Sequence, residues 1–172
     1  MSREMDHSEL THLDAAGRLR MVDIGGKGVT RRRAVARAAV EMAPATLAAI
    51  LAGGLPKGDV LATARLAGIA AAKRTDELIP LCHQLPLEMV AVRFRQNGPA
   101  CLEIEAEVAL TGRTGVEMEA MVAASLAGLT IYDMAKAVDR GMRLREVRLV
   151  SKEGGGSGTW RREGEEQWTT WL

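Results

Sequence analysis

The sequence predicts an α+β fold in which helices cover one face of an antiparallel sheet. Residues 89–95 and 101–108 alternate between apolar and polar side chains and flank a turn at 97–99, which predicts a β-hairpin. Residues 114–139 are mostly small or aliphatic and contain no proline, which predicts a long helix. Placed in order with the elements below, they give the βαββαβ arrangement of a ferredoxin-like sandwich.

Before the hairpin the chain predicts two strands and two helices. Residues 19–24 are predicted to form a short strand, followed by a glycine loop at 25–28 that carries Lys27. Residues 34–42 alternate, which favours a strand, although their alanine content favours a helix. Pro44 suits the first turn of a short helix that runs to about Ala52.

A second helix is predicted from Val60 to about Leu78, with Asp59 as its N-cap. The next segment, 79–86, contains Pro80 and Pro86, so a regular helix cannot continue through it. The last predicted strand is 147–151.

Length and composition predict one domain, residues 21–153, between a mobile arm (1–20) and a glycine-rich tail (154–172). The three tryptophans lie in the tail, which we expect to be mobile or docked on a neighbouring subunit and not part of the core. With 23 basic and 22 acidic residues, the net charge of +1 gives no indication of nucleic-acid or membrane binding. Two cysteines and no apolar leader or membrane-length segment predict a cytoplasmic protein.

The long helix carries a candidate acid–base pair, Asp133 and Lys136. Residues three apart lie on one face of a helix, so the two side chains should be neighbours. Spacing alone is equally compatible with an ordinary surface ion pair. Because the surrounding helix is apolar nearly all round, we expect a buried pair whose pKa values depend on its environment.

Two further groups carry candidate chemistry. Cys82 and His83 lie between prolines in a rigid, non-helical segment, where a buried cysteine beside a hydrogen-bonded histidine is the simplest interpretation. Zinc is not indicated, because His7, His12 and His83 lack ligand spacing. Glu117 and Glu119 begin the long helix, where they complement its dipole or accept hydrogen bonds from the N–H edge of a guanine or reduced pterin.

Basic residues recur at the junctions between elements, several beside glycine-rich turns that expose backbone N–H groups to phosphate. They are Lys27, Arg32, Lys57, Lys73, Arg113 and Lys152. Neither a Walker sequence nor a Rossmann fingerprint is present. Nucleic-acid binding through residues 31–33 would require a basic domain with interleaved aromatics, and the sequence has one Phe and one Tyr.

Four long segments resemble the cyclic pyranopterin monophosphate synthase family of molybdenum-cofactor biosynthesis. They occur in the family's order and cover most of residues 10–158. They are LTHLDAAGRLRMVDI (10–24), KGDVLATARLAGIAAAKRTDELIPLCHQLPL (57–87), LTGRTGVEMEAMVAASLAGLTIYDMAKAV (110–138) and VRLVSKEGGGSG (147–158). Matches of this length are far more specific than a short motif.

The resemblance implies a lyase that converts (8S)-3′,8-cyclo-7,8-dihydroguanosine 5′-triphosphate, derived from GTP, to cyclic pyranopterin monophosphate and diphosphate. It implies a homohexamer, a trimer of dimers, with active sites at subunit interfaces. Asp133 and Lys136 take the catalytic roles in this resemblance. The implied substrate-binding residues are Leu81, Cys82, His83, Glu117, Met118, Glu119, Arg32, Lys57, Lys73 and Lys152.

The chain departs from the family at Gly156, where the family commonly has a lysine (GGKSG). Because Lys152 remains, we expect activity with one positive contact fewer. The sequence requires no cofactor and no bound metal, although Mg²⁺ accompanying the triphosphate is compatible with it. The alternative is a non-catalytic pterin- or nucleotide-binding module on the same fold, which would bind ligand without turnover.

Overall fold

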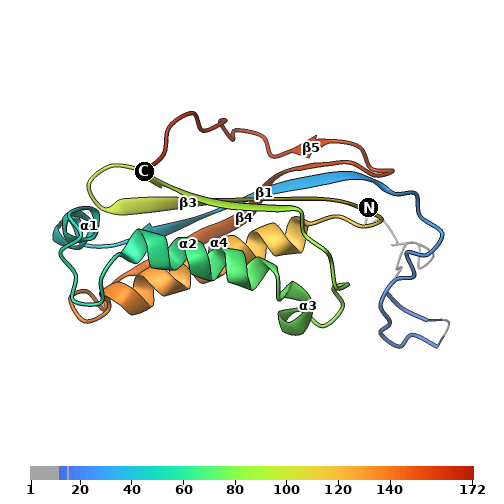
Figure 1. The fold of residues 1–172 in the computed structure, drawn as a ribbon, viewed down its shortest axis with the longest axis horizontal. Helices are drawn as coiled ribbons and strands as arrows, with labels where there is room; N and C mark the ends of the chain where they lie inside the picture. The colour runs from blue at the N-terminus through green and yellow to red at the C-terminus, as the bar shows by residue number, and fades with distance from the viewer. Residues whose placement is uncertain (1–11, 15) are drawn as a thin grey trace, which may run out of the picture.

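The computed structural model describes residues 12–14 and 16–172 of the chain (Figure 1). Most of the predicted mobile arm, residues 1–11 and 15, lies outside the described residues. The strand predicted at 19–24 is wrong, because Leu19 makes only an isolated antiparallel bridge with Leu13. A strand is held by backbone hydrogen bonds to a neighbouring strand, and residues 20–24 pair with no strand of the sheet.

One five-stranded sheet organises the molecule. Its order is β2-β3-β1-β4-β5, and all neighbouring strands are antiparallel. The four long strands have the order expected of a ferredoxin-like βαββαβ fold, and the α+β prediction is confirmed. The strands are β1 (Thr30–Glu41), β2 (Met89–Gln96), β3 (Cys101–Gly112), β4 (Arg143–Glu153) and β5 (Trp160–Arg161).

The helices are α1 (Pro44–Leu51), α2 (Val60–Ala72), α3 (Thr75–Leu78) and α4 (Glu117–Ala135). Asp59 caps α2 as predicted, because its carboxylate accepts from the Ala62 N–H at 2.9 Å. The helix predicted to continue to Leu78 instead ends at Ala72 and restarts as α3. At the break, the Thr75 hydroxyl donates to the Ala72 carbonyl at 3.0 Å, which replaces a helical hydrogen bond.

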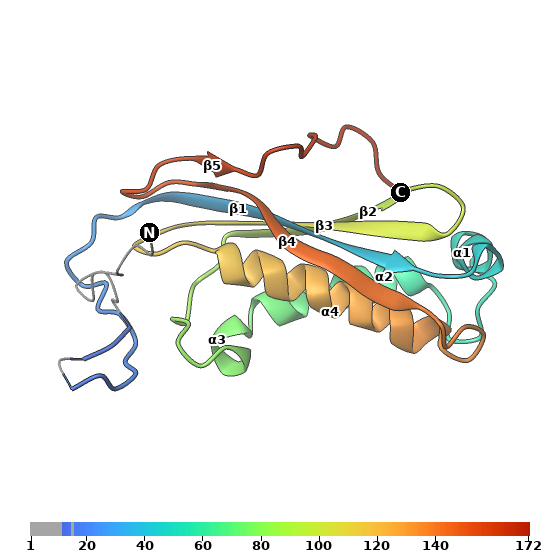
Figure 2. The same cartoon turned by 180° about the vertical axis from the view of Figure 1, so that it is seen from behind.

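Helices α2 and α4 lie against one face of the sheet, and the C-terminal segment crosses the other face (Figures 1 and 2). The even-numbered residues of β1 from Ala34 to Val40 are buried in the core beneath the helices. The odd-numbered residues between them are also buried, so both faces of β1 are covered from residue 34 to residue 40. This segment is a strand, as its alternating pattern predicts, and not the helix that its alanine content would favour.

Small residues let α2 and α4 pack closely. A Cβ added at Gly68 would lie 2.9 Å from the Ala123 carbonyl oxygen of α4 and 3.0 Å from Val92 Cγ2. The neighbouring atom on α4 is backbone, so it cannot rotate away. The glycine therefore sets the distance between the two helices.

Gly68→Ala is expected to lower the free energy of unfolding by about 1–2 kcal/mol, measured by urea unfolding, because it overpacks the helix interface. Helix propensity alone would change it by about 1 kcal/mol in the opposite direction. Ala70→Gly, at an exposed position of the same helix, measures how much helix propensity alone changes the free energy of unfolding. A stabilised Gly68→Ala protein would contradict close packing at this point.

The tail, expected to be mobile or docked on a neighbouring subunit and outside the core, does lie outside the apolar core, but it is ordered on its own chain. The tail packs on its own sheet, and Trp168 is only 3% exposed. Its indole is held between two arginines of the sheet, Arg37 and Arg95, 4.5 Å and 4.2 Å from the ring centre. Within the described part of the chain, no helix is both long and apolar enough to cross a membrane.

Candidate functional site

The N-terminal end of α4 forms one wall of a cleft of about 300 Å³, here called the acidic cleft. The opposite wall is the proline-bounded segment after α3, together with residues Val22 to Lys27 of the N-terminal segment. The two prolines keep the segment after α3 out of helix, so it can face α4. Six predicted substrate-binding residues meet here: Leu81, Cys82, His83, Glu117, Met118 and Glu119.

Glu119 is the most perturbed group in the acidic cleft. It is only 4% exposed. Desolvation, reinforced by the charges of Glu117 and Asp76, raises the pKa of Glu119 from 4.5 to about 7. This carboxyl therefore changes protonation near neutral pH, as acid–base groups and ligand-binding carboxylates in active sites often do. The sequence pointed to Glu119 as a ligand-binding residue but gave no sign of this shift.

Cys82 and His83 have different environments in the cleft. His83 Nε2 lies 2.8 Å from the Val22 carbonyl oxygen, so that nitrogen carries a proton and donates. Desolvation, then the charges of Glu119 and Asp76, raise the pKa of the Cys82 thiol. A protonated thiol is a poor nucleophile, so the environment of Cys82 does not favour cysteine catalysis. Among residues 12–14 and 16–172, no group of three or more His, Cys, Asp or Glu side chains is arranged to hold a metal.

A second cleft of about 680 Å³, here called the basic cleft, adjoins the first. Lys27, Thr114, Gly115 and Glu117 line both, so the two form one continuous depression. The described residues that line the basic cleft include two carboxylates and five basic side chains. The basic side chains are Lys27, Arg32, Arg33, Arg113 and Lys152.

These basic side chains differ in how far they are already paired. Arg33 is bound to Glu107 at 2.6 Å and to Glu153 at 2.9 Å. Arg32 donates only to the backbone, to Gly112 O at 3.4 Å and Arg113 O at 3.3 Å, so its charge is not neutralised there. Lys152 contacts Glu117 at 3.3 Å and the Ser157 hydroxyl at 3.1 Å. Arg32 and Lys152 can therefore turn toward an anion with little loss.

The glycine-rich segment 153–158 forms one rim of the basic cleft. Gly155 has φ of +75°, and a Cβ there would lie 1.7 Å from Arg32 Nη1, so the backbone lies directly on the guanidinium. Gly156 is different, because a Cβ there would meet nothing within 4 Å. The position where the resembled family commonly has a lysine thus has room for a side chain.

Asp133 and Lys136 lie at the opposite end of α4, together with Lys57. Lys136 Nζ lies 2.7 Å from Asp133 Oδ1, and Lys57 Nζ lies 2.7 Å from Asp133 Oδ2. Hydrogen bonds from Lys136 and then Lys57 lower the pKa of Asp133 to about 2. The Asp133 carboxylate in turn raises the pKa of Lys136.

The prediction of a buried pair is wrong for a single chain. The side chains of Asp133 and Lys136 are 55% and 51% exposed. The last turn of α4 is still covered on its inner face, where Ile131, Met134 and Ala135 are buried, but Asp133 and Lys136 lie on its outward face. Water therefore solvates the pair, and the carboxylate stabilises the ammonium form.

One chain divides the predicted residues between two half-sites. Fourteen residues separate Glu119 from Asp133 on α4, which corresponds to about 21 Å along the axis. Lys57 belongs to the Asp133 half. Lys73 is exposed at the C-cap of α2, and α2 runs antiparallel to α4, so Lys73 lies at the end that holds Glu119 (Figure 1).

Comparisons with known proteins identify the family. The MoaC family matches residues 21–155. The curated protein "Cyclic pyranopterin monophosphate synthase" of Chloroflexus aggregans is 61% identical over 165 residues, 95% of this chain and 98% of the relative. Relatives of the same name in Thermomicrobium roseum and Pelotomaculum thermopropionicum are 59% and 58% identical, and the match covers 96% of each. The chain belongs to the MoaC family.

Proposed function

We propose that this chain is a cyclic pyranopterin monophosphate synthase of molybdenum-cofactor biosynthesis. It acts as a lyase on (8S)-3′,8-cyclo-7,8-dihydroguanosine 5′-triphosphate and releases diphosphate. The observation that carries the proposal is the continuous depression in which the acidic cleft adjoins the basic cleft. A guanine-derived ring joined to a triphosphate needs hydrogen-bond acceptors for its N–H groups at one end of the site and cations for its phosphates at the other.

The ring binds in the acidic cleft. Guanine and its dihydro derivatives present N–H donors on one edge, and ionised Glu117 and Glu119 are acceptors only. Leu81 and Met118 supply apolar contacts on the same walls. With its pKa near 7, Glu119 can also take up or release a proton as the purine imidazole ring opens and the pterin closes.

The triphosphate binds in the basic cleft. Arg32 makes no ion pair with a described carboxylate, Lys152 makes one long contact with Glu117, and Lys27 lies where the two clefts meet. Positive groups stabilise the negative charge that develops as a ribose hydroxyl attacks the α-phosphate and diphosphate leaves. A Mg²⁺ ion arriving with the triphosphate would be held by the substrate's own phosphate oxygens, and the protein itself requires no cofactor for these steps.

Lys136 acts as a general acid–base and Asp133 orients it. In the single chain this lysine is exposed and its pKa is raised, which does not suit proton transfer near neutrality. Covering the pair with protein would desolvate it and favour the neutral amine. The proposed catalytic step therefore requires a second subunit.

A homohexamer, a trimer of dimers with interface active sites, would supply that subunit. Leu129 is 50% exposed and lies one helical turn before Asp133, and Leu66 of α2 is 68% exposed. Large apolar side chains left in water beside a polar cluster are typical of an interaction surface. A copy docked there could bring its acidic and basic clefts to the Asp133–Lys136 pair, which no single chain can do across about 21 Å.

We also place the protein in the cytoplasm, where its two unpaired cysteines, Cys82 and Cys101, would stay reduced.

The test is anaerobic incubation of the purified protein with the cyclic dihydroguanosine triphosphate, assaying diphosphate and the oxidised pterin product. GTP serves as the matched control substrate, since it has the same triphosphate but not the 3′,8 bond. Turnover of the cyclic compound but not GTP is expected. Binding without turnover would favour a non-catalytic pterin- or nucleotide-binding module, and equal diphosphate release from both would indicate a simple nucleotide hydrolase.

A further inference from the structure

The C-terminal segment 160–172, here called the strap, crosses the sheet face opposite the helices (Figures 1 and 2). It starts as β5, which pairs with β4 so that Trp160 faces Lys152 and Arg161 faces Ser151. At its other end, the Leu172 N–H donates to Phe94 O of β2 at 2.9 Å. The strap therefore joins the two sides of the sheet.

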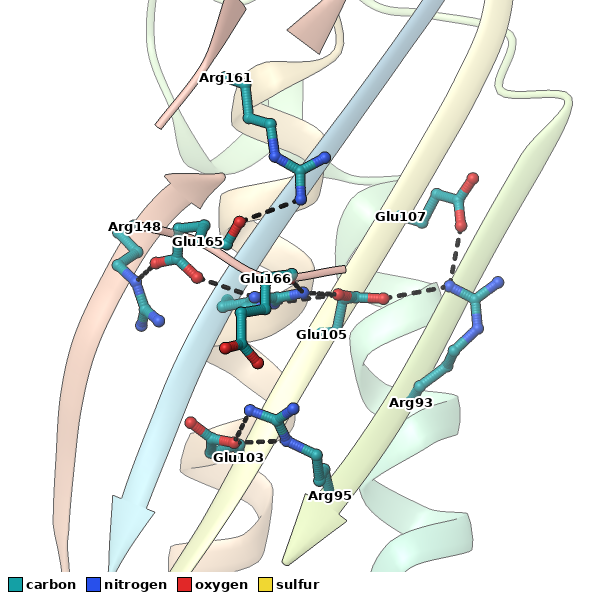
Figure 3. Close-up of polar contacts among 10 residues, drawn as sticks. Arg93, Arg95, Glu103, Glu105, Glu107, Arg148, Arg161, Glu165 and Glu166 are labelled. Carbon is teal, nitrogen blue, oxygen red and sulfur yellow. Dashed lines mark hydrogen bonds and ion pairs between the residues drawn. The ribbon is translucent and has the colours of Figure 1, made fainter. Parts of the chain in front are cut away.

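The strap is anchored at its middle by charge (Figure 3). Glu165 binds Arg37 of β1 at 2.8 Å and also pairs with Arg148 of β4. Arg37 is 4% exposed, and it also binds Glu105 at 2.6 Å and donates to the Glu166 carbonyl at 2.7 Å. Ion pairs with this little solvent contact are strong only while every partner is in place.

Trp168 is the second anchor. Its ring lies between the guanidinium groups of Arg37 and Arg95. The hydrophobic core under the helices does not include Trp168. Releasing the strap would therefore uncover a charged sheet face and leave the apolar core intact.

The strap also closes the rim of the basic cleft. Segment 153–158 runs from the last residue of β4 toward β5, and Gly154, Gly155 and Gly158 all have positive φ. Glycines lose more conformational freedom on ordering than other residues, so this segment needs an external restraint to keep one shape. Pairing of Trp160 with Lys152 supplies it, because it fixes both ends of the segment at the cleft.

We propose that the strap is a positioning element, in which Glu165 and Trp168 hold segment 153–158 closed over Arg32 and keep Lys152 directed at the substrate phosphates. The proposal rests on the proposed function for the identity of the anion. Glu165 and Trp168 touch no substrate and act through the segment. They lie on the far face of the sheet, and among the described residues none of their ion pairs or ring contacts reaches a residue that lines the acidic cleft. The strap should therefore affect binding of the phosphates more than the chemical step.

The test compares the full-length chain with the double variant Glu165→Gln/Trp168→Ala, and with Glu163→Gln as control. Glu163 is an exposed carboxylate two residues from the anchor. Hydrogen exchange is followed separately in the strap, in segment 153–158 and in β1 and β3. In the double variant we expect at least tenfold faster exchange in the strap and in 153–158, unchanged protection of β1 and β3, and no change in Glu163→Gln.

The kinetic measurement separates positioning from general destabilisation. KM for the cyclic triphosphate should rise about tenfold in the double variant, with kcat changed less than about threefold. Faster exchange in the strap with unchanged exchange in 153–158 and unchanged KM would overturn the proposal, as would a strap that stays protected in the double variant. If β1 and β3 lose protection, Glu165→Gln alone is measured with the same criteria.

The exchange measurement does not depend on turnover. A wild-type protein without turnover would refute the proposed function, and the exchange of 153–158 would still decide whether the strap restrains that segment. Normal wild-type turnover with unchanged KM in the double variant would refute the strap's role alone.

Discussion

Lys136→Ala is expected to reduce turnover of the cyclic triphosphate by roughly 10²–10⁴-fold, the usual contribution of a general acid–base. Substrate binding should weaken much less, because the acidic and basic clefts lie at the other end of α4. Arg140→Ala is the matched control, since Arg140 is an exposed cation four residues further along the chain, in the turn after α4. Equal loss in both variants, or full activity in Lys136→Ala, would contradict the assignment.

The same variant tests whether each active site is built from two chains. Glu119→Gln damages the cleft half, and Lys136→Ala damages the other half. When the two variants are co-expressed in equal amounts and assemble at random, about a quarter of composite sites receive one intact half from each chain. The mixture is therefore expected to recover about 25% of wild-type activity, whereas each variant alone is expected to be nearly inactive.

The control for recovery is a mixture of Asp133→Asn with Lys136→Ala. Both substitutions fall in the same half-site, where the two side chains lie 2.7 Å apart, so no combination of chains can restore it. Recovery in the first mixture only would establish sites shared between subunits. No recovery in either mixture would mean that residues of a single chain form the site.

The division into half-sites could have been deduced from the sequence. Glu119 and Asp133 were both assigned to one uninterrupted helix, and a rise of 1.5 Å per residue separates them by about 21 Å. What the sequence could not indicate was exposure at the end of that helix. Met134 and Ala135 in the last turn of α4 are buried, yet the neighbouring Asp133 is exposed on the outward face of the helix.

Sequence patterns predicted the elements that are stabilised by contacts between residues close together in the chain. The hairpin of β2 and β3 and the Asp59 cap both depend on residues within a short stretch. The strap depends instead on Glu165 meeting Arg37, 128 residues earlier in the chain. Alternating charges on β1 and β3 are equally compatible with a solvated face, so no local pattern could show which segment covers them.

Glu119→Gln is expected to make stability less dependent on pH. The native pKa of about 7 lies above the ordinary 4.5, so between these values the folded chain binds more protons than the unfolded chain. Stability from this group is therefore greatest below pH 4.5 and falls as pH rises toward 7, by roughly 3 kcal/mol. Glutamine stays neutral, so relative to wild type the variant should gain that amount at pH 8 and nothing at pH 4.

Urea unfolding at fixed protein concentration over pH 4–8 measures this difference, since a constant concentration keeps the contribution of assembly comparable. Glu77→Gln, at an exposed carboxyl of α3, should change stability by less than about 0.5 kcal/mol at every pH. A parallel shift of the Glu119→Gln curve at all pH values would mean that the carboxylate is solvated or paired. The cleft would then hold an ordinary anion, and Glu119 could accept hydrogen bonds from a ring but could not exchange protons with it near neutrality.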